Sequence, residues 1–361
     1  MILVLSSTEE TPKRVFLHAS CMILLENGNN CKENRIMLYC MAERTVVTIK
    51  LILILLSVAA GLCLITCAVC FYITFYAPRR KVKNAPEFEL PPGKIYEPYR
   101  DTMVAWMKEV RAMPFENWSI TAADGLTLWG KFYEYTPGAT IELMFHGYRG
   151  SSERDLCGGV QRCFNLGHSA LVVDQRTSGK SGGHVITFGA KEQDDCLRWV
   201  DFCVNRFGKD VKLILTGISM GAATVLMAAG HELPEQVVGI LADCGYTSAE
   251  EIIRKCTRQL RLPDRLLYPF VRFSGILFGG FDPNRADAQK AMTRCKKPVI
   301  FFHGEDDDFV PCEMSRKNFD ACAAPKKLVT TPGAGHGLCY LADREGYLAA
   351  MREFGREHGW N

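Results

Sequence analysis

Three residues far apart in the chain, Ser219, Asp307 and His336, have the side-chain types needed for nucleophilic attack on a carbonyl group. Serine is a weak nucleophile at its own pKa, so a histidine must accept its proton during the attack. An acid holds the imidazole in the correct tautomer and stabilises its charged form. The order serine, acid, histidine along the chain is one in which this set of groups is known to occur.

The sequence around Ser219 predicts how a serine could be presented for this chemistry. It reads Gly217-Ile218-Ser219-Met220-Gly221. The preceding run, residues 211–216, is short and rich in branched side chains, as a buried strand would be, and residues 222–229 have the composition of a helix. A Gly-x-Ser-x-Gly turn between strand and helix is a nucleophile elbow. The glycines let the two elements approach, and the serine is expected in a strained backbone conformation at the helix N-terminus.

The elements that must position these residues alternate along the chain from about residue 115. Strands are expected at residues 118–121, 126–133, 141–145, 170–174, 211–216, 237–242, 298–302 and 327–331. The first two are expected to form an antiparallel hairpin, because Asp124-Gly125 lies at the turn. Helices are expected at residues 155–166, 191–207 and 222–230. Apolar strands that alternate with helices predict an α/β fold with a mainly parallel central sheet flanked by helices.

Ligands of such sheets bind at the carboxyl ends of the strands. Four loops occupy these positions: His146–Gly150, the elbow, His303–Pro311 and Pro332–Gly337. Alone, Asp307 could be a solvated loop acid and His336 a surface turn residue. Their shared place with Ser219 at the strand ends favours a catalytic set instead.

The alternation is interrupted between Tyr246 and Cys295. A helix is expected at residues 249–260, and residues 262–281 are rich in Leu, Phe, Tyr and Pro. This pattern predicts a short helical cap insertion at about residues 247–295, over the carboxyl ends of the strands. Its apolar side chains could line an acyl pocket, dip toward a bilayer, or simply pack the cap onto the body.

The N-terminal region contains an uncharged apolar run. Residues 51–77 carry no charge, and as a helix they would span about 40 Å against a hydrocarbon core of about 30 Å. No polar face interrupts the run, so a tilted transmembrane helix is favoured over a buried core helix. Arg79, Arg80, Lys81 and Lys83 follow it directly. The positive-inside rule therefore favours the cytoplasm for the catalytic body, with the opposite orientation as the alternative.

These features predict a domain plan. Residues 1–45 are expected to be a disordered or non-native N-terminal extension, because residues 1–40 show neither helical nor strand periodicity and Met41-Ala42-Glu43-Arg44 resembles a natural start. Residues 46–78 are the expected transmembrane anchor. Residues 79–114, with several prolines, are expected to be a stiff linker. Residues 115–361 are the expected catalytic domain.

Composition limits the partners. Of the 361 residues, 48% are apolar and 23% are charged, and the net charge of +3 gives no basis for a nucleic-acid partner. Among the 16 cysteines, Cys67 and Cys70 form the only C-x-x-C, and it lies in an apolar run that does not suit a metal site. The cysteines show no disulfide framework, which indicates a reducing compartment.

Several motifs together resemble a known family. They are Phe145-His146-Gly147-Tyr148, Asp174-Gln175-Arg176, Gly179-Lys180-Ser181-Gly182-Gly183, Gly217-Ile218-Ser219-Met220-Gly221, Ala242-Asp243-Cys244-Gly245-Tyr246 and His303-Gly304-Glu305-Asp306-Asp307. The chain looks like a member of the α/β-hydrolase superfamily, in the bacterial serine aminopeptidase-like or esterase branch whose members include membrane-anchored proteins. The resemblance covers about residues 115–355.

The resemblance implies roles for particular residues. The family pattern His-Gly-x-x-Asp-x-x-Val-Pro puts the acid on Asp307, and the oxyanion hole is expected from the backbone N–H groups of Met220 and Tyr148. No cofactor is implied.

The predicted function is a membrane-anchored serine hydrolase that cleaves carboxylic esters through an acyl-serine intermediate. The expected substrate is a small-molecule ester or a lipid-like ester, because an alkoxide leaves more easily than an amine. The alternatives are a peptidase or amidase of the serine aminopeptidase type, and a non-hydrolytic acyltransferase or binding protein on the same scaffold.

Overall fold

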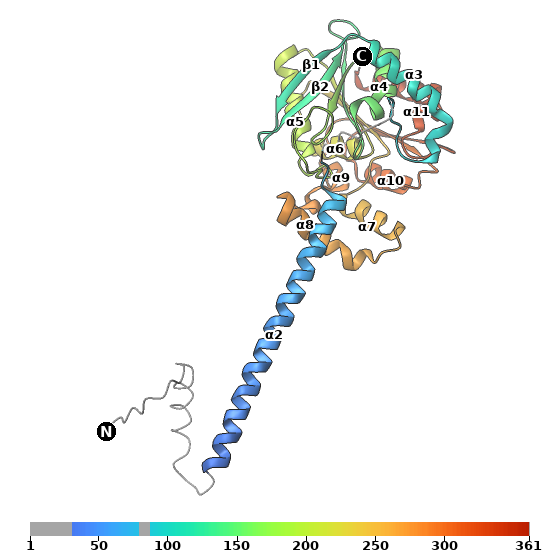
Figure 1. The fold of residues 1–361 in the computed structure, drawn as a ribbon. Coiled ribbons are helices and arrows are strands. Elements are labelled where there is room, and N and C mark those ends of the chain that lie inside the picture. Colours follow the sequence, from blue (N-terminus) through green and yellow to red (C-terminus); the bar gives the residue numbers. More distant parts are fainter. Residues whose placement is uncertain (1–30, 79–86, 361) are drawn as a thin grey trace. The chain divides into compact units, whose positions relative to one another are not determined.

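The computed structural model describes residues 31–78 and 87–360, and the chain divides into two units, Met1–Ile65 and Thr66–Asn361 (Figure 1). The first unit contains most of helix α2 (Cys31–Thr74). Within the described residues, this is the one helix long and apolar enough to cross a membrane, over Met37–Thr74, and nearly all of its most apolar stretch is exposed. The helix begins at Cys31, earlier than the predicted residue 46. No Gly or Pro occurs between residues 31 and 60, so nothing in the sequence ends it sooner.

The second unit is built on an eight-stranded sheet in the order β1-β2-β4-β3-β5-β6-β7-β8. Its strands are β1 (Glu116–Thr121), β2 (Thr127–Tyr133), β3 (Ile141–Phe145), β4 (Ser169–Asp174), β5 (Leu213–Ile218), β6 (Val237–Asp243), β7 (Val299–Gly304) and β8 (Lys326–Thr331). Strands β1 and β2 form the predicted antiparallel hairpin, β2 pairs antiparallel with β4, and the other pairs are parallel. Every residue of β3 is buried, because helices cover both faces of the sheet.

Helices occupy both faces of this sheet and form two separate cores. One face packs against α3 (Arg100–Ala112), α4 (Ser152–Leu166), α11 (Cys339–Ala342) and α12 (Arg344–His358). The other packs against α5 (Glu192–Phe207), α6 (Met220–Ala228), α9 (Ala288–Met292) and α10 (Cys312–Ala321). The cap consists of α7 (Ala249–Gln259) and α8 (Asp264–Gly279), and two short 3₁₀ helices, η1 (Lys94–Tyr99) and η2 (Pro283–Arg285), complete the unit.

The sheet and its two helical layers agree with the predicted α/β architecture. The region predicted as a stiff linker, residues 79–114, is instead partly helical. Residues 94–112 form η1 and α3 and pack onto the body. The buried residues of α3, Met103, Trp106, Met107 and Val110, recur at helical spacing, so their burial accounts for this helix. The prolines between residues 86 and 98 favoured the prediction of a linker, although the apolar spacing of a helix follows them. Residues 1–30 and the basic residues 79–83 used for the orientation lie outside the described residues.

The chain leaves α2 as an extended segment that belongs to the second unit. Tyr76 forms a β-bridge with Val185, and the Ala77 N–H donates to the carbonyl oxygen of His184 over 2.9 Å. Phe75 is fully buried, with its ring edge-on to those of Phe188 and Phe281. Helix α2 therefore ends four residues before residue 78, the end expected for the transmembrane segment, and the residues after the helix are part of the second unit.

Candidate active site

The strand-to-helix turn at Ser219 is as tight as the elbow pattern predicts. Ser219 has φ 57° and ψ −117°, a backbone conformation that is costly for any residue other than glycine. It follows β5 and immediately precedes α6. A Cβ on Gly217 would lie 2.2 Å from the backbone of Gly221, and one on Gly221 would lie 2.0 Å from the carbonyl oxygen of Phe145. Only glycine fits at these two positions, so the sequence imposes the turn.

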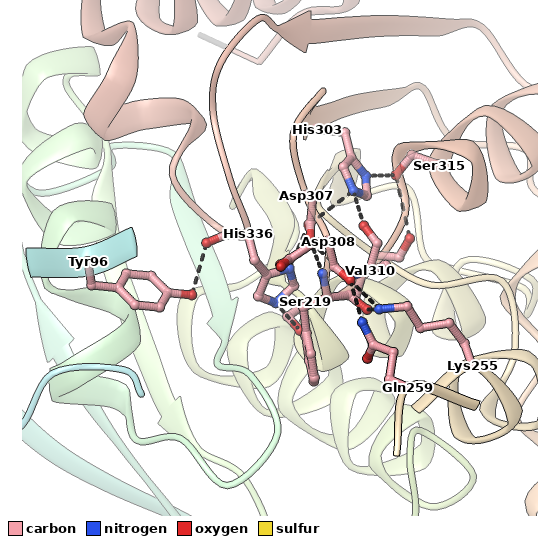
Figure 2. Close-up of polar contacts among 12 residues, drawn as sticks. Tyr96, Ser219, Lys255, Gln259, His303, Asp307, Asp308, Val310, Ser315 and His336 are labelled. Atoms are coloured by element: carbon pink, nitrogen blue, oxygen red, sulfur yellow. Dashed lines mark hydrogen bonds and ion pairs between the residues drawn. The ribbon is translucent and has the colours of Figure 1, made fainter. Parts of the chain in front are cut away.

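The three predicted residues form one hydrogen-bonded chain (Figure 2). The distance from Ser219 Oγ to His336 Nε2 is 2.9 Å, and from His336 Nδ1 to Asp307 Oδ2 it is 2.7 Å. Ser219 follows β5, while Asp307 and His336 lie in the loops after β7 and β8. Ser219 and Asp307 are buried and His336 is half-buried. With Nδ1–H donating to the carboxylate, Nε2 is free to accept the serine proton.

Asp307 is the one of three consecutive aspartates that faces the histidine. The side chains of Asp306 and Asp308 are exposed. Oδ1 of Asp307 accepts hydrogen bonds from the backbone N–H groups of Phe309 and Val310, at 2.9 and 2.8 Å. The carboxylate is therefore held in a fixed orientation by its own loop.

A second histidine supports this carboxylate. His303 Nε2 lies 3.2 Å from Asp307 Oδ2 and 2.8 Å from the carbonyl oxygen of Val310, and His303 Nδ1 lies 2.6 Å from Ser315 Oγ. Because a carbonyl can only accept, Nε2 carries the proton. Burial alone would raise the pKa of Asp307, but the hydrogen bonds and charges of His303 and His336 hold that pKa well below its usual range. Asp307 is thus ionised at neutral pH.

Three further side chains hold the loops of the site by hydrogen bonds, and none of these bonds was predicted. The Tyr96 hydroxyl, from η1, donates to the carbonyl oxygen of His336 over 3.0 Å. In the cap, Lys255 and Gln259 both donate to the carbonyl oxygen of Asp308 (Figure 2). His303 could have been noticed as a polar residue at a strand end, whereas the sequence holds no signal for Tyr96, which lies in the predicted linker.

The two residues expected to form the oxyanion hole, Met220 and Tyr148, lie in segments next to Ser219. Met220 is the first residue of α6, where backbone N–H groups have no partner within the helix. A Cβ on Gly147 would lie 3.9 Å from Ser219 Oγ, so the loop that carries Tyr148 passes next to the serine. The neighbouring N–H groups are occupied, because the Gly147 N–H donates to Asp155 and the Ser219 N–H donates to the carbonyl oxygen of Asp243.

A cavity of about 620 Å³ adjoins these loops. Its lining includes His146 and Met220, beside the nucleophile, and Tyr72, Ile73 and Tyr76 from the end of α2 and the segment after it. This size matches pockets that hold small organic molecules.

One group of possible metal ligands overlaps the site. Ligand atoms of Cys244, Asp307 and His336 lie within 4.8 Å of one another. Burial raises the pKa of the Cys244 thiol well above its usual value, so it would be protonated. Asp307 and His336 already bond each other, and this group therefore makes a poor metal site.

Comparisons with known proteins agree with this geometry. A family model described as "Serine hydrolase (FSH1)" matches residues 247–338, which include Asp307 and His336. A Bacillus subtilis protein, "Uncharacterized protein YqkD", is 29% identical over 191 residues, and the match spans 53% of this chain and 63% of that protein, less than two thirds of its length.

Solved structures share the architecture. The Pyrococcus furiosus esterase Pf2001 aligns with a TM-score of 0.58 at 20% identity, over 79% of this chain and 98% of that one. Est1E from Butyrivibrio proteoclasticus aligns with a TM-score of 0.51 at 22% identity, over 67% of this chain and 99% of that one. At these identities the likeness shows a common fold, and the family-model match supports a hydrolase.

Proposed function

We propose that this chain, whose fold is that of the α/β-hydrolases, is a membrane-anchored serine hydrolase that cleaves carboxylic esters through an acyl-serine intermediate. The observation that carries the proposal is the hydrogen-bonded chain from Ser219 through His336 to Asp307, with distances of 2.9 and 2.7 Å.

Each member of this chain has a distinct role in the proposed reaction. Ser219 Oγ attacks the ester carbonyl while His336 Nε2 takes its proton. Asp307 keeps Nδ1–H of His336 pointed at itself and stabilises the imidazolium that forms. Because the pKa of Asp307 is held below its usual range, this carboxylate keeps its negative charge throughout the neutral range. His336 then returns the proton to the departing alkoxide.

The negative charge that develops on the carbonyl oxygen needs donors that are already in place. The backbone N–H groups of Met220 and Tyr148 are assigned to this role, and the N-terminus of α6 adds a favourable dipole. Loss of one such donor typically costs about 2.7–4 kcal/mol of transition-state stabilisation. Water activated by His336 then attacks the acyl-serine and releases the acid.

Helix α2 is assigned as the membrane anchor, on the basis of its length and its exposed apolar surface. The four basic residues at 79–83 favour a cytoplasmic position for the catalytic unit. Protease treatment of intact and of permeabilised cells tests the orientation: a cytoplasmic catalytic unit is cleaved only after permeabilisation, and cleavage in intact cells would reverse the assignment.

Hydrolysis of a short p-nitrophenyl ester by the detergent-solubilised full chain tests the chemistry. Wild type should release p-nitrophenol, and Ser219→Ala should lower kcat by several orders of magnitude. Ser119→Ala, at an exposed serine of β1, is the matched control and should retain full activity. Activity that persists in Ser219→Ala would refute the assignment.

A further inference from the structure

The cap helix α8 presents an apolar surface outward. Leu266, Pro269, Phe273, Ile276 and Leu277 are exposed and recur at the spacing of a single helix face, which we call the α8 stripe. The exposed fractions of Leu266 and Phe273 are 64% and 52%.

The opposite side of α8 packs onto the body through Tyr268, Val271, Ser274 and Gly275, all of them buried. The stripe therefore takes no part in packing the cap onto the body. A contiguous exposed apolar surface of this kind marks a binding surface in most soluble domains.

The α8 stripe continues onto the end of helix α2. The ring of Phe278, which follows the stripe on α8, lies 5.6 Å from the ring of Phe71. Next to Phe71, Tyr72 and Ile73 are exposed. These residues belong to the candidate membrane span, so lipid that covers this end of α2 would reach α8 without a gap.

Charge around the stripe suits a lipid surface. Between residues 249 and 280 the sequence has six basic residues and three acidic ones. Arg258, Arg261 and Arg265 are exposed on α7, on the turn between the cap helices and at the start of α8. Arginines beside an apolar face can place their charged ends among lipid headgroups, and anionic lipids attract them.

We propose that the α8 stripe lies in the bilayer surface beside the end of α2 and that the substrate is an ester resident in that bilayer. This rests on the proposed esterase function. The large cavity beside the nucleophile has Tyr72, Ile73 and Tyr76 in its lining, so residues next to the lipid-facing surface also wall the candidate substrate site. An amphiphilic ester could then reach Ser219 without crossing water.

Fluorescence quenching tests the membrane contact independently of activity. The full chain is reconstituted in vesicles of phosphatidylcholine and phosphatidylglycerol, with a fluorescent amino acid at position 273. Lipids that carry a nitroxide on the upper acyl chain should quench it. The matched control is the same fluorophore at position 207, where Phe207 is also exposed but lies at the end of α5. The control should not be quenched.

Two results would overturn the contact. An emission maximum that indicates water, without quenching, would show that the stripe is solvated. A blue-shifted emission without quenching by lipid would show that a protein, such as a second copy of the chain, covers the stripe.

Activity on two esters tests the substrate class. The double variant Phe273→Ser/Ile276→Ser should lower hydrolysis of a long-chain ester embedded in vesicles about 10-fold, because less apolar surface holds the cap in the lipid. Hydrolysis of a soluble short ester should stay within about twofold of wild type, and so should both activities of Phe207→Ser. An equal fall for the two esters, or no fall for either, would refute a bilayer-resident substrate.

These outcomes separate the two proposals. If wild type hydrolyses neither ester, the esterase function fails while the quenching result still decides the membrane contact. If wild type hydrolyses the soluble ester and the stripe is not quenched, the inference fails alone.

Discussion

The hydroxyl of Tyr148 donates a hydrogen bond of 2.7 Å to the carbonyl oxygen of Thr74, the last residue of helix α2. The neighbouring Arg149 donates to the Tyr148 hydroxyl over 2.8 Å and to the carbonyl oxygens of Ile73 and Tyr76 over 2.9 and 3.0 Å. The carbonyls at a helix C-terminus have no partner within the helix, and these two side chains supply partners. Hydrogen bonds therefore connect the end of α2 to the loop that carries Tyr148 and Arg149, which passes next to Ser219.

This hydrogen bond from the Tyr148 hydroxyl predicts that Tyr148→Phe impairs catalysis, although the backbone N–H of residue 148 is kept. Without the hydroxyl the loop is less firmly placed, and a small misplacement of an oxyanion donor is costly. We expect kcat on a soluble ester to fall about 10-fold with little change in KM. Tyr135→Phe, at an exposed tyrosine, should have no effect. An unchanged kcat in Tyr148→Phe would show that the hydrogen bond between Tyr148 and Thr74 does not position the loop.

Asp307→Asn should retain the fold and lose most of the activity. An amide can donate to His336 Nδ1 and so stabilise the wrong tautomer, and it cannot stabilise the imidazolium. A fall in kcat of about four orders of magnitude is expected from such a change. Steady-state kinetics measure it, and Asp306→Asn, at an exposed side chain, should stay within about twofold of wild type. A larger loss in Asp306→Asn than in Asp307→Asn would move the acid to the neighbouring residue.

A buried ion cluster lies beneath the elbow and should make stability depend on pH. Glu142 is fully buried, bonds Arg162, and lies 2.9 Å from His168 Nδ1 and 3.1 Å from Thr216 Oγ1 of β5. Burial alone would raise the pKa of Glu142, but Arg162 and His168 outweigh it and lower that pKa to about 2. This folded-state pKa lies below the value of about 4.3 for a glutamate in an unfolded chain. The ionised Glu142 therefore contributes fully to the free energy of unfolding above about pH 4.3, and this contribution is lost as the pH falls toward 2.

Glu142→Gln should therefore lower the free energy of unfolding by about 3–5 kcal/mol at neutral pH, since it leaves Arg162 buried without its anion. Urea unfolding followed by tryptophan fluorescence measures the difference, which should shrink below about pH 4. Glu232→Gln, whose ion pair with Lys296 is exposed, should leave the unfolding midpoint unchanged. If Glu142→Gln lowered the free energy of unfolding by the same amount at pH 3 and at pH 7, this account would be contradicted.

The parts of the fold that were predicted correctly depend on local signals. Strand β3 is apolar except for Glu142 because both of its faces are buried, and the elbow could be predicted because only glycine fits at positions 217 and 221. The four loops at the strand ends were likewise placed by the order of the elements. That order placed an acid and His336 near Ser219, while the choice of Asp307 among the neighbouring acids rested on the resemblance to the family pattern.

Other features depend on contacts between distant segments, which no local pattern records. Tyr96 reaches the carbonyl oxygen of His336 across 240 positions in sequence, and Phe75 packs against Phe281. Helix α3 was a different case, since its apolar spacing was present in the sequence but the flanking prolines favoured a linker. His303 was visible at a strand end, yet its bond with Asp307 requires the fold.

The identity of the nucleophile is the central claim, and a mass measurement tests it most directly. The full chain in detergent is treated with a fluorophosphonate, digested, and its peptides are sequenced by tandem mass spectrometry. The account predicts one stoichiometric adduct on Ser219, with labelling abolished in Ser219→Ala and strongly slowed in Asp307→Asn. An adduct on another residue, or no adduct on an active wild-type enzyme, would contradict it.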